Sequence, residues 1–327
     1  MRKKAIIYII TTLLISSGGL LKAQDAHFSQ FYANPMYLNP AFAGTAVCPR
    51  LIMNYRNQWP AISGAFVTYN AGFDMHFDAI SGGLGVLVTS DRAGEGVLTT
   101  NTASLIYSYK LQVTRFFAIK AGFQGSFFQK SLDGSKLTFG NQIDARWGFV
   151  YDQNPKIPTL SSSGVDFSAG MLGFSEKFYI GFAVHHLTQP DEGLQTTSLL
   201  PMKLTFHTGG IIPLTRGKRR RRPEDPVLSP NVAFFMQGPY HQMNYGLYVN
   251  KLPIIAGLWY RQFFEGSDAL IVLLGFQYDK FKFGYTYDIT VSKLASASGG
   301  AHEISFAMMF NCPIKKRHVR EISCPSF

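Results

Sequence analysis

Apolar and polar positions alternate along segment after segment of this 327-residue chain. In KFKFGYTYDIT (residues 280–290), every second side chain from Phe281 to Ile289 is aromatic or aliphatic, and those between are lysine, glycine, threonine or aspartate. The same two-residue period recurs in residues 51–58, 66–77 and 116–130. Successive side chains of a strand point to opposite faces, so each segment has one apolar face and one small or polar face.

This pattern predicts fourteen strands, most of them about 9–11 residues long, the length that a tilted strand needs to span a bilayer. An even number is usual for a bacterial single-chain barrel whose two termini lie in the periplasm. The strands are expected near residues 50–58, 65–76, 81–90, 98–110, 114–130, 164–175, 177–186, 201–214, 229–238, 240–250, 252–264, 268–278, 279–290 and 300–311.

The connections between these strands alternate in length. If the first strand runs outward, the short turns near residues 111–113, 175–176, 251 and 279 are periplasmic. The long connections at residues 131–163, 187–200 and 291–299 then all lie outside the cell.

The composition favours a membrane barrel over the alternative, a soluble β-sandwich or lectin-like protein. Charged residues make up 16% and aromatic residues 14% of the chain, whereas soluble domains have about 25% charged residues. No later window is long and apolar enough for a membrane helix. Because a lysine facing lipid at the midplane costs about 2–4 kcal/mol, Lys120, Lys280 and Lys282 are expected to face the lumen.

The first residues are typical of a secretory signal peptide. Three basic residues precede a short apolar run, and the small residue Ala23 stands before Gln24. We therefore expect a cleaved signal peptide (1–23), an N-terminal segment (24–47), the barrel (48–312) and a periplasmic tail (313–327).

The N-terminal segment contains a dense aromatic stretch, HFSQFYANPMYLNPAFAG, at residues 27–44. Its two Asn-Pro steps prevent a regular helix or strand ladder. A barrel of fourteen strands encloses a lumen that would leak if it were empty. We predict that the stretch forms a plug or a collar at the periplasmic mouth; the alternative is a plain lead-in to the first strand.

The candidate residues for the lumen or for a partner are His27, Phe28, Phe31, Tyr32, Tyr37, Arg56, Trp59, Lys120 and Lys282. Cation–π contacts with the aromatics are expected from Arg56, Lys120 and Lys282, and Asn70 is a further candidate partner.

Several motifs resemble those of the PorP/SprF family of outer-membrane proteins. They are the opening segment QDAHFSQFYANPMYLNPAFAG, then NYRNQWP, LPMKLTFHTGG, AGLWYR, FGYTYDITVS and GAHEIS, in order along the mature chain. The resemblance implies a role in the type IX secretion and gliding machinery, in which such barrels accompany cell-surface adhesins or other cargo. It implies no active site and no cofactor.

The residues themselves point to no catalysis. His185-His186, His207, His241 and His302-Glu303 are scattered over strands, and no nucleophile with a base and an orienting group is evident. Adjacent strand residues such as His185 and His186 face opposite sides and make a weak metal site. We expect polar lumen or rim residues, no cofactor and no metal.

The basic run at residues 216–226 contains Arg219, Arg220, Arg221 and Arg222, and the chain carries a net charge of +11. No aromatics interleave the run for base stacking, so nucleic acid is not expected as a partner. The topology places this basic patch in the periplasm. It is either a solvated loop or a dock for an acidic partner or anionic head groups.

Three cysteines, Cys48, Cys312 and Cys324, lie outside the strand interiors. Closure of a barrel brings its first and last strands together, which makes a Cys48–Cys312 disulfide one option. A Cys312–Cys324 disulfide within the tail and a fully reduced set are the others.

Three functions follow from these features. The first is a non-enzymatic barrel that receives, helps to export or anchors a surface protein, with type IX components and outer-membrane lipid as further partners. The second is a passive solute channel, and the third is a hydrolase in the lumen or at the rim.

Overall fold

The computed structural model describes most of the chain after the leader. The described residues are 25–46, 48–62, 64–94, 96–114, 116–137, 143–144, 146–149, 158–215, 225–264, 266–291 and 298–312. Within them, no helix is long and apolar enough to cross a membrane.

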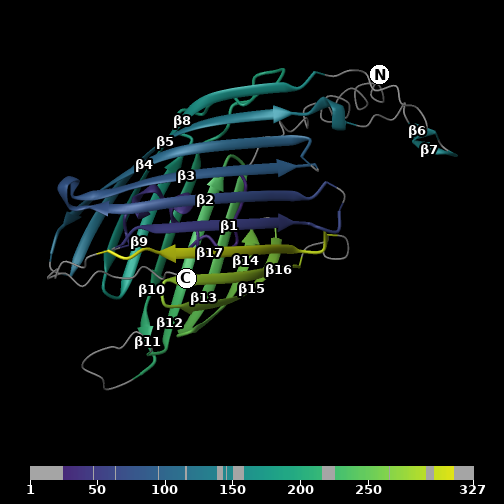
Figure 1. The fold of residues 1–327 in the computed structure, drawn as a ribbon. Helices are drawn as coiled ribbons and strands as arrows, with labels where there is room; N and C mark the ends of the chain where they lie inside the picture. The colour runs from purple at the N-terminus through teal and green to yellow at the C-terminus, as the bar shows by residue number, and fades with distance from the viewer. Residues whose placement is uncertain are drawn as a thin grey trace, which may run out of the picture.

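The strands form a closed antiparallel β-barrel (Figure 1). The main sheet has fifteen strands, of which β11 is a two-residue appendage on β12, so fourteen strands form the wall. Each wall strand pairs with its neighbour along the chain, β1 pairs with β17, and β10 pairs directly with β12 across the loop between them. Closure leaves no free edge around most of the ring, which satisfies the backbone hydrogen bonds within lipid. The wall strands are β1 (Arg50–Gln58), β2 (Phe66–Phe77), β3 (Gly82–Ala93), β4 (Leu98–Gln112), β5 (Phe117–Leu132), β8 (Leu160–Ser175), β9 (Phe178–His185), β10 (Lys203–Gly210), β12 (Val227–Gln237), β13 (Tyr240–Lys251), β14 (Ile254–Phe263), β15 (Gly266–Tyr278), β16 (Phe281–Thr290) and β17 (Ala301–Met309).

The fourteen predicted strands are confirmed, with bounds that shift by a few residues. The alternation did not reveal β6 (Ile143–Asp144), β7 (Gly148–Phe149) or β11 (Ile212–Pro213), because two-residue strands are too short to show a period. The β6–β7 hairpin lies beyond the end of the barrel (Figure 1). The remaining elements are the helix α2 (Pro35–Leu38) and the 3-10 turns η1 (Pro40–Phe42), η2 (Asp78–Ile80) and η3 (Gly134–Lys136).

The barrel has two different ends. At the end where β1 begins and β17 ends, which we call the terminal end, the turns β2–β3, β4–β5, β8–β9, β13–β14 and β15–β16 are short. The opposite end, the loop end, carries the long connections β5–β8, β9–β10 and β16–β17. The three long connections predicted for one end are confirmed there, but the β10–β12 connection, residues 211–226, is also long and lies at the terminal end. Lys280 lies in the short β15–β16 turn, so its predicted lumen position is wrong.

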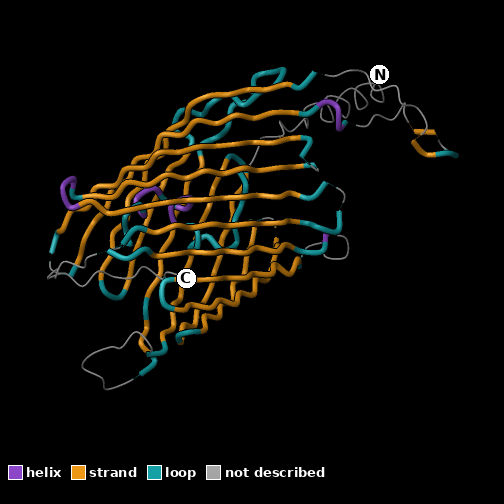
Figure 2. The backbone as a smooth tube through the Cα atoms, in the orientation of Figure 1, coloured by secondary structure: helices purple, strands orange, loops and turns teal. Residues whose placement is uncertain are grey.

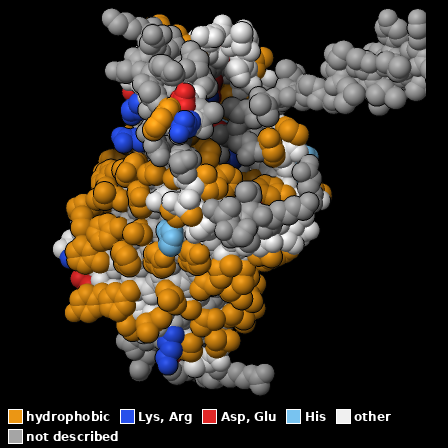
Figure 3. Space-filling model, turned by 90° about the vertical axis from the view of Figure 1, so that its right-hand side faces the viewer, with side chains coloured by type: hydrophobic (Ala, Val, Ile, Leu, Met, Phe, Trp, Pro, Cys, Tyr) orange, Lys and Arg blue, Asp and Glu red, His pale blue; other side chains and the backbone are white. Residues whose placement is uncertain are grey.

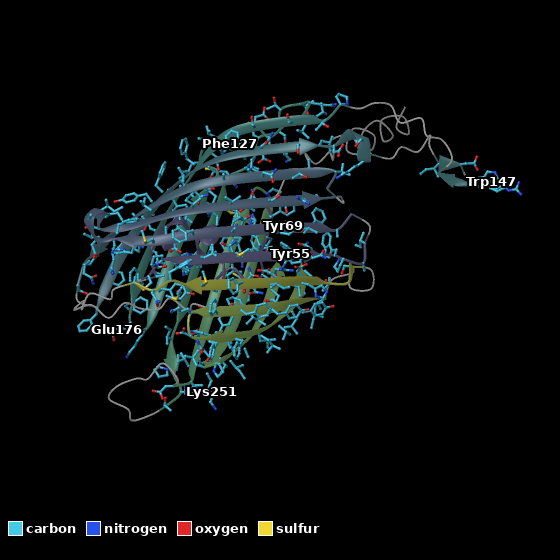
Figure 4. All side chains as sticks on the ribbon, viewed as in Figure 1. Tyr55, Tyr69, Phe127, Trp147, Glu176 and Lys251 are labelled. Carbon is cyan, nitrogen blue, oxygen red and sulfur yellow. A yellow bond between two sulfur atoms is a disulfide. The ribbon has the colours of Figure 1, made fainter. Side chains whose placement is uncertain are left out.

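The two faces of the wall differ as the alternation requires. Outward side chains are large and apolar; examples are Met53, Tyr69 and Phe127, which are 48%, 44% and 53% exposed. Figure 4 shows Tyr69 and Phe127 on the outside of the wall, and Figure 3 shows one side of the molecule covered largely by hydrophobic side chains. A continuous apolar exterior of this kind fits a lipid environment.

A disulfide joins the two chain ends of the barrel. Cys48 precedes β1, Cys312 follows β17, and their sulfur atoms are bonded at 2.03 Å. Of the pairings left open by the sequence, the structure contains Cys48–Cys312. Cys324 and the rest of the tail lie outside the described residues.

Candidate functional site

The lumen is filled by the chain's own N-terminal segment, residues 25–46, which we call the plug. The short elements α2 and η1 lie inside the ring of strands (Figure 2). At the loop end, the Asp25 backbone N–H donates to Gln237 Oε1 over 3.2 Å. At the terminal end, the Gly44 N–H donates to Asp74 Oδ2 over 2.8 Å. The plug therefore runs through the barrel from one end to the other. The prediction of a plug is confirmed, although it extends well beyond the terminal mouth, and the alternative of a plain lead-in to the first strand is wrong.

The two Asn-Pro steps shape the plug. Pro35 and Pro40 stand at the first positions of α2 and η1, where a missing N–H costs nothing and the fixed φ suits a helical start. The Asn39 side chain accepts a hydrogen bond from the Ala41 N–H over 2.9 Å. It also donates to the carbonyl oxygens of Met171 and Phe182, at 3.0 and 3.2 Å. The same residue thus caps a turn of the plug and ties it to β8 and β9.

A buried ion cluster on the wall grips the middle of the plug. Arg56 binds Asp288 and Glu303, both at 3.1 Å, and Arg261 binds Asp288 at 3.0 Å. The Ser29 hydroxyl donates to Asp288 Oδ2 and accepts from Arg56 Nη1 over 2.7 Å. All these side chains are at least nine-tenths buried.

Glu303 also binds the backbone of the plug. The N–H groups of Ser29 and Gln30 donate to its two carboxylate oxygens over 2.6 and 3.0 Å. The Gln30 side chain returns a hydrogen bond to the Glu303 carbonyl oxygen over 2.9 Å. Charge-assisted hydrogen bonds of this kind are roughly twice as strong as neutral ones.

An aromatic cluster packs beside the ion cluster. The Phe31 ring meets Trp259 edge-on with centroids 4.8 Å apart, and Tyr32 lies 5.8 Å from the same ring. Tyr32 also contacts the rings of Tyr179 and Tyr248. Rings in this range of distances and tilts are worth about 0.5–1.5 kcal/mol per pair beyond burial.

At the loop end, Asp25 joins the plug to a second charged group. Its Oδ2 lies 2.8 Å from His186 Nε2 and 3.1 Å from Lys203 Nζ, and His186 Nδ1 lies 2.8 Å from Asp166. Burial lowers the pKa of His186, but the neighbouring carboxylates outweigh it and raise the pKa to about 10. Burial raises the pKa of Asp25, whereas His186 and Lys203 hold it well below the usual range. Both groups are therefore charged at neutral pH.

At the terminal end, the plug is held by its backbone. The Ala43 carbonyl oxygen accepts from Ser108 Oγ and Lys120 Nζ, both at 2.6 Å. Asp74 accepts from the Gly44 N–H and pairs with Arg50 at 2.9 Å.

Glycines on the inner wall make room for the plug. A Cβ at Gly122 would stand 2.3 Å from the Ala41 nitrogen, and one at Gly170 would stand 2.0 Å from Asn39 Oδ1. A Cβ at Gly83 would stand 2.4 Å from the Ala43 oxygen. The wall and the plug are thus fitted to each other at the level of single atoms.

The structure brings most of the predicted lumen residues together. Phe28, Phe31, Tyr32, Arg56 and Lys120 are buried in the lumen or the plug, and His27 and Tyr37 are partly buried there. Arg56 and Lys120 donate hydrogen bonds to oxygen atoms in place of the predicted cation–π contacts. Lys203 instead lies over the Tyr37 ring at 5.1 Å.

Of the remaining predicted residues, Lys282 and Asn70 lie on the inner face of the wall, as predicted, whereas Trp59 lies at the rim. Trp59 follows β1 at the loop end, where its ring contacts Phe66 at 5.6 Å, away from the plug. Lys282 is half-buried on β16 opposite Ala307, near the terminal end. Asn70 donates to Thr89 over 2.7 Å rather than to an aromatic ring. The basic patch Arg219–Arg222 and the leader lie outside the described residues.

The sequence reasoning missed the residues that anchor the plug on the wall: Arg261, Asp288 and Glu303. Each lies on the polar face of a strand with alternating apolar and polar residues. A charged residue at such a position could have been predicted to face the lumen. Ser29 and Gln30 gave no such signal, because they act through a hydroxyl and backbone N–H groups.

Beside the plug, a cavity of about 330 Å³ lies toward the loop end. Its wall carries mainly hydroxyl and amide side chains, among them Thr100, Thr102 and Gln124, and Asp25 belongs to its lining. Within the described residues, no cluster of histidine, cysteine or acidic side chains is arranged to hold a metal ion.

Solved structures with a similar fold are outer-membrane barrels. The toluene transporter TbuX of Ralstonia pickettii matches with a TM-score of 0.52 and 10% identity, over 84% of this chain and 93% of its own. The monoaromatic hydrocarbon channel CymD matches with a TM-score of 0.49 and 12% identity, over 86% and 93% of the two chains. At such identities the likeness to TbuX shows the fold alone. No significant match was found among curated proteins.

The family is shown by a sequence model. The model of the type IX secretion system membrane protein PorP/SprF matches residues 20–308, which include the plug and nearly the whole barrel. The motifs that suggested this resemblance lie largely on the plug and on the strands that grip it. The chain is a member of the PorP/SprF family of type IX secretion system membrane proteins.

Proposed function

We propose that this protein is a non-enzymatic, plugged barrel that receives or anchors an exported surface protein for the type IX secretion system. The observation that carries the proposal is the plug itself, held in the lumen at both ends and in the middle by buried polar contacts. A barrel whose lumen is closed by its own plug is better suited to anchor a partner protein than to conduct solutes.

The plug also argues against the second candidate, a passive solute channel. Opening the lumen would strip Glu303 of two backbone donors and Asp288 of the Ser29 hydroxyl. Water would replace these contacts in an opened lumen, and hydrogen bonds to charged groups are worth about 1.5–3 kcal/mol each after that exchange. TbuX is a toluene transporter, but at 10% identity its function does not carry over to this chain.

The family and the three long connections at the loop end support one orientation of the barrel in the membrane. With the terminal end in the periplasm, the basic patch Arg219–Arg222 and the tail 313–327 face the periplasmic components of the system. The loop end, with its long connections, faces the surface protein, and outer-membrane lipid surrounds the apolar wall. The leader 1–23 is removed on export, so that residues 24–47 can enter the barrel 48–312.

Deletion of residues 27–44 tests the proposal. The deletion removes no wall strand, so the barrel should still show heat-modifiable gel migration. It should raise single-channel conductance in planar bilayers and reduce the amount of surface protein that co-purifies from membranes. Lys251→Ala serves as the control, because this exposed side chain lies at the short β13–β14 turn, away from the plug and from the loop end.

The result that contradicts the proposal is a deletion variant that stays sealed and still carries its partner. A wild-type protein that conducts solutes at a high level would instead support the channel.

A further inference from the structure

The wall of the barrel is uneven in height. β4 has 15 residues and β5 and β8 have 16 each, whereas β9 and β10 have 8. β8 pairs with β5 along its whole length, but it pairs with β9 only over Ala169–Phe174. Among the described residues, no strand therefore pairs with the β9 side of β8 over residues 160–168.

The parity of β8 identifies which backbone groups face this free edge. The Leu187 N–H donates to the Phe167 carbonyl oxygen over 2.9 Å, so Phe167 points its backbone toward the β9 side. In an antiparallel sheet the N–H and C=O of one residue point to the same edge, and those of the next residue point to the opposite edge. The N–H and C=O groups of Ser161, Ser163 and Val165 therefore lie along the free edge.

The loop after β9 does not take the place of a strand here. Thr188 donates to the Asp166 carboxylate over 2.8 Å, and Glu192 binds Lys130 at 2.9 Å. Asp166 and Lys130 both belong to the inner face of the wall. Residues 188–192 therefore lie on the lumen side of β8 and leave its edge open.

At Ser161 and Ser163, the free edge lies beyond the lipid-facing band. On the outer face, Phe127 pairs with Val165, and they are 53% and 61% exposed. One step further toward the loop end, the outward row across β4, β5 and β8 becomes polar: Asn101, Gln129 and Ser163. The next row is Thr99, Ser131 and Ser161. An open strand edge is not tolerated within hydrocarbon, and these polar rows place this edge in water.

A cleft adjoins the edge on its inner side. It has a volume of about 370 Å³ and is lined by Leu98, Leu132 and Leu160, with the Lys130–Glu192 pair, residues 193–196 and Ser198. A strand added beside β8 would turn alternate side chains toward this cleft. An apolar side chain of the added strand would fit the cleft. The side chains on the other face of that strand would lie beside the polar outer rows of β5 and β8.

We propose that the β8 edge at residues 160–166 accepts an extended strand of a surface polypeptide, with apolar side chains at the positions that face the cleft. This inference rests on the proposed function and names the site at which the partner is held. Strand addition gains affinity from main-chain hydrogen bonds and specificity from pockets for alternate side chains. Ser161, Ser162, Ser163 and Gly164 offer small side chains that do not obstruct such a strand.

A second copy of this chain fits the edge less well. Two barrels in one membrane are related by an axis along the membrane normal, and wall strands tilt by about 35–45°. Their β8 edges would then cross at about 70–90°, twice that tilt. Within the described part of the same chain, the loop after β9 lies on the lumen side of β8, and the β6–β7 hairpin lies away from β8 in Figure 1.

Photo-crosslinking in intact cells provides the first arm of the test. A photoreactive amino acid at Ser161 should crosslink to a segment of a surface polypeptide that has apolar residues at alternate positions. The matched control is Ser131, which lies in the same outward row but is paired on both sides by β4 and β8. Crosslinks to residues 138–157 of this chain, to a second copy, or equally at both positions would overturn the inference.

Binding of the crosslinked segment, made as a synthetic peptide, provides the second arm. Ser163→Pro removes one N–H from the free edge and leaves the β5 ladder intact, and proline is tolerated on strand edges. This variant should lose at least tenfold in peptide affinity and keep heat-modifiable migration, whereas Ser163→Ala should bind like the wild type.

Equal peptide binding by Ser163→Pro and Ser163→Ala would overturn the inference. If the wild type carries a surface protein that never crosslinks at Ser161, the β8 edge is not the binding site, and the proposed function stands. If the wild type carries no surface protein, the proposed function itself fails.

Discussion

At the scale of single residues, the wall supplies the charges of the ion cluster in the middle of the lumen, and the plug supplies dipoles there. Arg56 and Arg261 converge on Asp288, while the plug contributes the Ser29 hydroxyl and two backbone N–H groups. Ser29 and Gln30 carry no charge, so their binding to the wall depends on hydrogen bonds that form only in this position. A displaced plug would leave the wall charges paired among themselves and open to water.

Replacement of Arg56 by methionine should destabilise the protein. The change leaves Glu303 without its arginine in a buried site, and breaking a buried pair in this way costs about 3–5 kcal/mol. We expect a lower midpoint for the heat-induced change in gel migration and a lower free energy of unfolding in urea.

Two variants control this prediction. Lys251→Met changes an exposed side chain at the terminal end (Figure 4) and should alter the free energy of unfolding by no more than about 0.5 kcal/mol. Arg56→Met combined with Glu303→Gln removes one charge of each sign and should recover part of the loss. An Arg56→Met protein as stable as the Lys251→Met protein would contradict the assignment.

At the scale of elements, the plug owes its shape to the wall. A four-residue helix and a three-residue turn have no stability of their own, because helix nucleation is unfavourable over so short a length. The plug's Asn39 bonds to β8 and β9, and Ala43 bonds to β4 and β5. The strands in turn carry glycine where the plug backbone passes closest.

Gly122→Ala should displace the plug without unfolding the barrel. The added Cβ would stand 2.3 Å from the Ala41 nitrogen, which belongs to the backbone and has no rotamer that relieves the contact. We expect a measurable rise in planar-bilayer conductance and faster thiol labelling of an Ala41→Cys variant in the same background.

Gly125 on the same strand provides the control. A Cβ there would meet the Phe167 ring at 3.5 Å, an ordinary van der Waals contact. Gly125→Ala should therefore stay sealed. If both variants stay sealed, the close fit of the plug to the wall does not keep the lumen shut.

At the scale of the whole molecule, the disulfide and the uneven rim make the two ends of the barrel different. Cys48–Cys312 ties the start of β1 to the end of β17 at the terminal end, next to the point where the plug leaves the lumen. The tall β4–β5–β8 wall projects at the loop end, where the long connections gather. A partner outside the cell and one in the periplasm would therefore meet quite different surfaces.

Thiol labelling in intact cells should show which end of the barrel faces the cell exterior and which faces the periplasm. Eight wall strands precede the connection that holds Arg220, so the chain has returned to its starting side. A cysteine at Arg220 should resist an impermeant reagent until the cells are permeabilised, whereas one at the exposed loop-end residue Gln195 should react at once. Equal labelling of the two in intact cells would overturn the orientation.

The sequence by itself determined the wall. Which face a strand residue occupies depends on its parity, a local property, so the alternation in residues 280–290 was enough to separate Phe281 and Phe283 from Lys282 and Asp288. The Asn-Pro steps and the aromatics likewise predicted a segment that is neither helix nor strand and that has to pack on something.

Only the tertiary structure decided what the lumen holds and where. Ser29 meets Glu303 across 274 residues of sequence, and Arg56 meets Asp288 across 232. Such pairs are set by the register and closure of the whole barrel, which no local period encodes. For the same reason Trp59, one residue beyond β1, lies at the rim, and the plug spans the lumen instead of resting at its mouth.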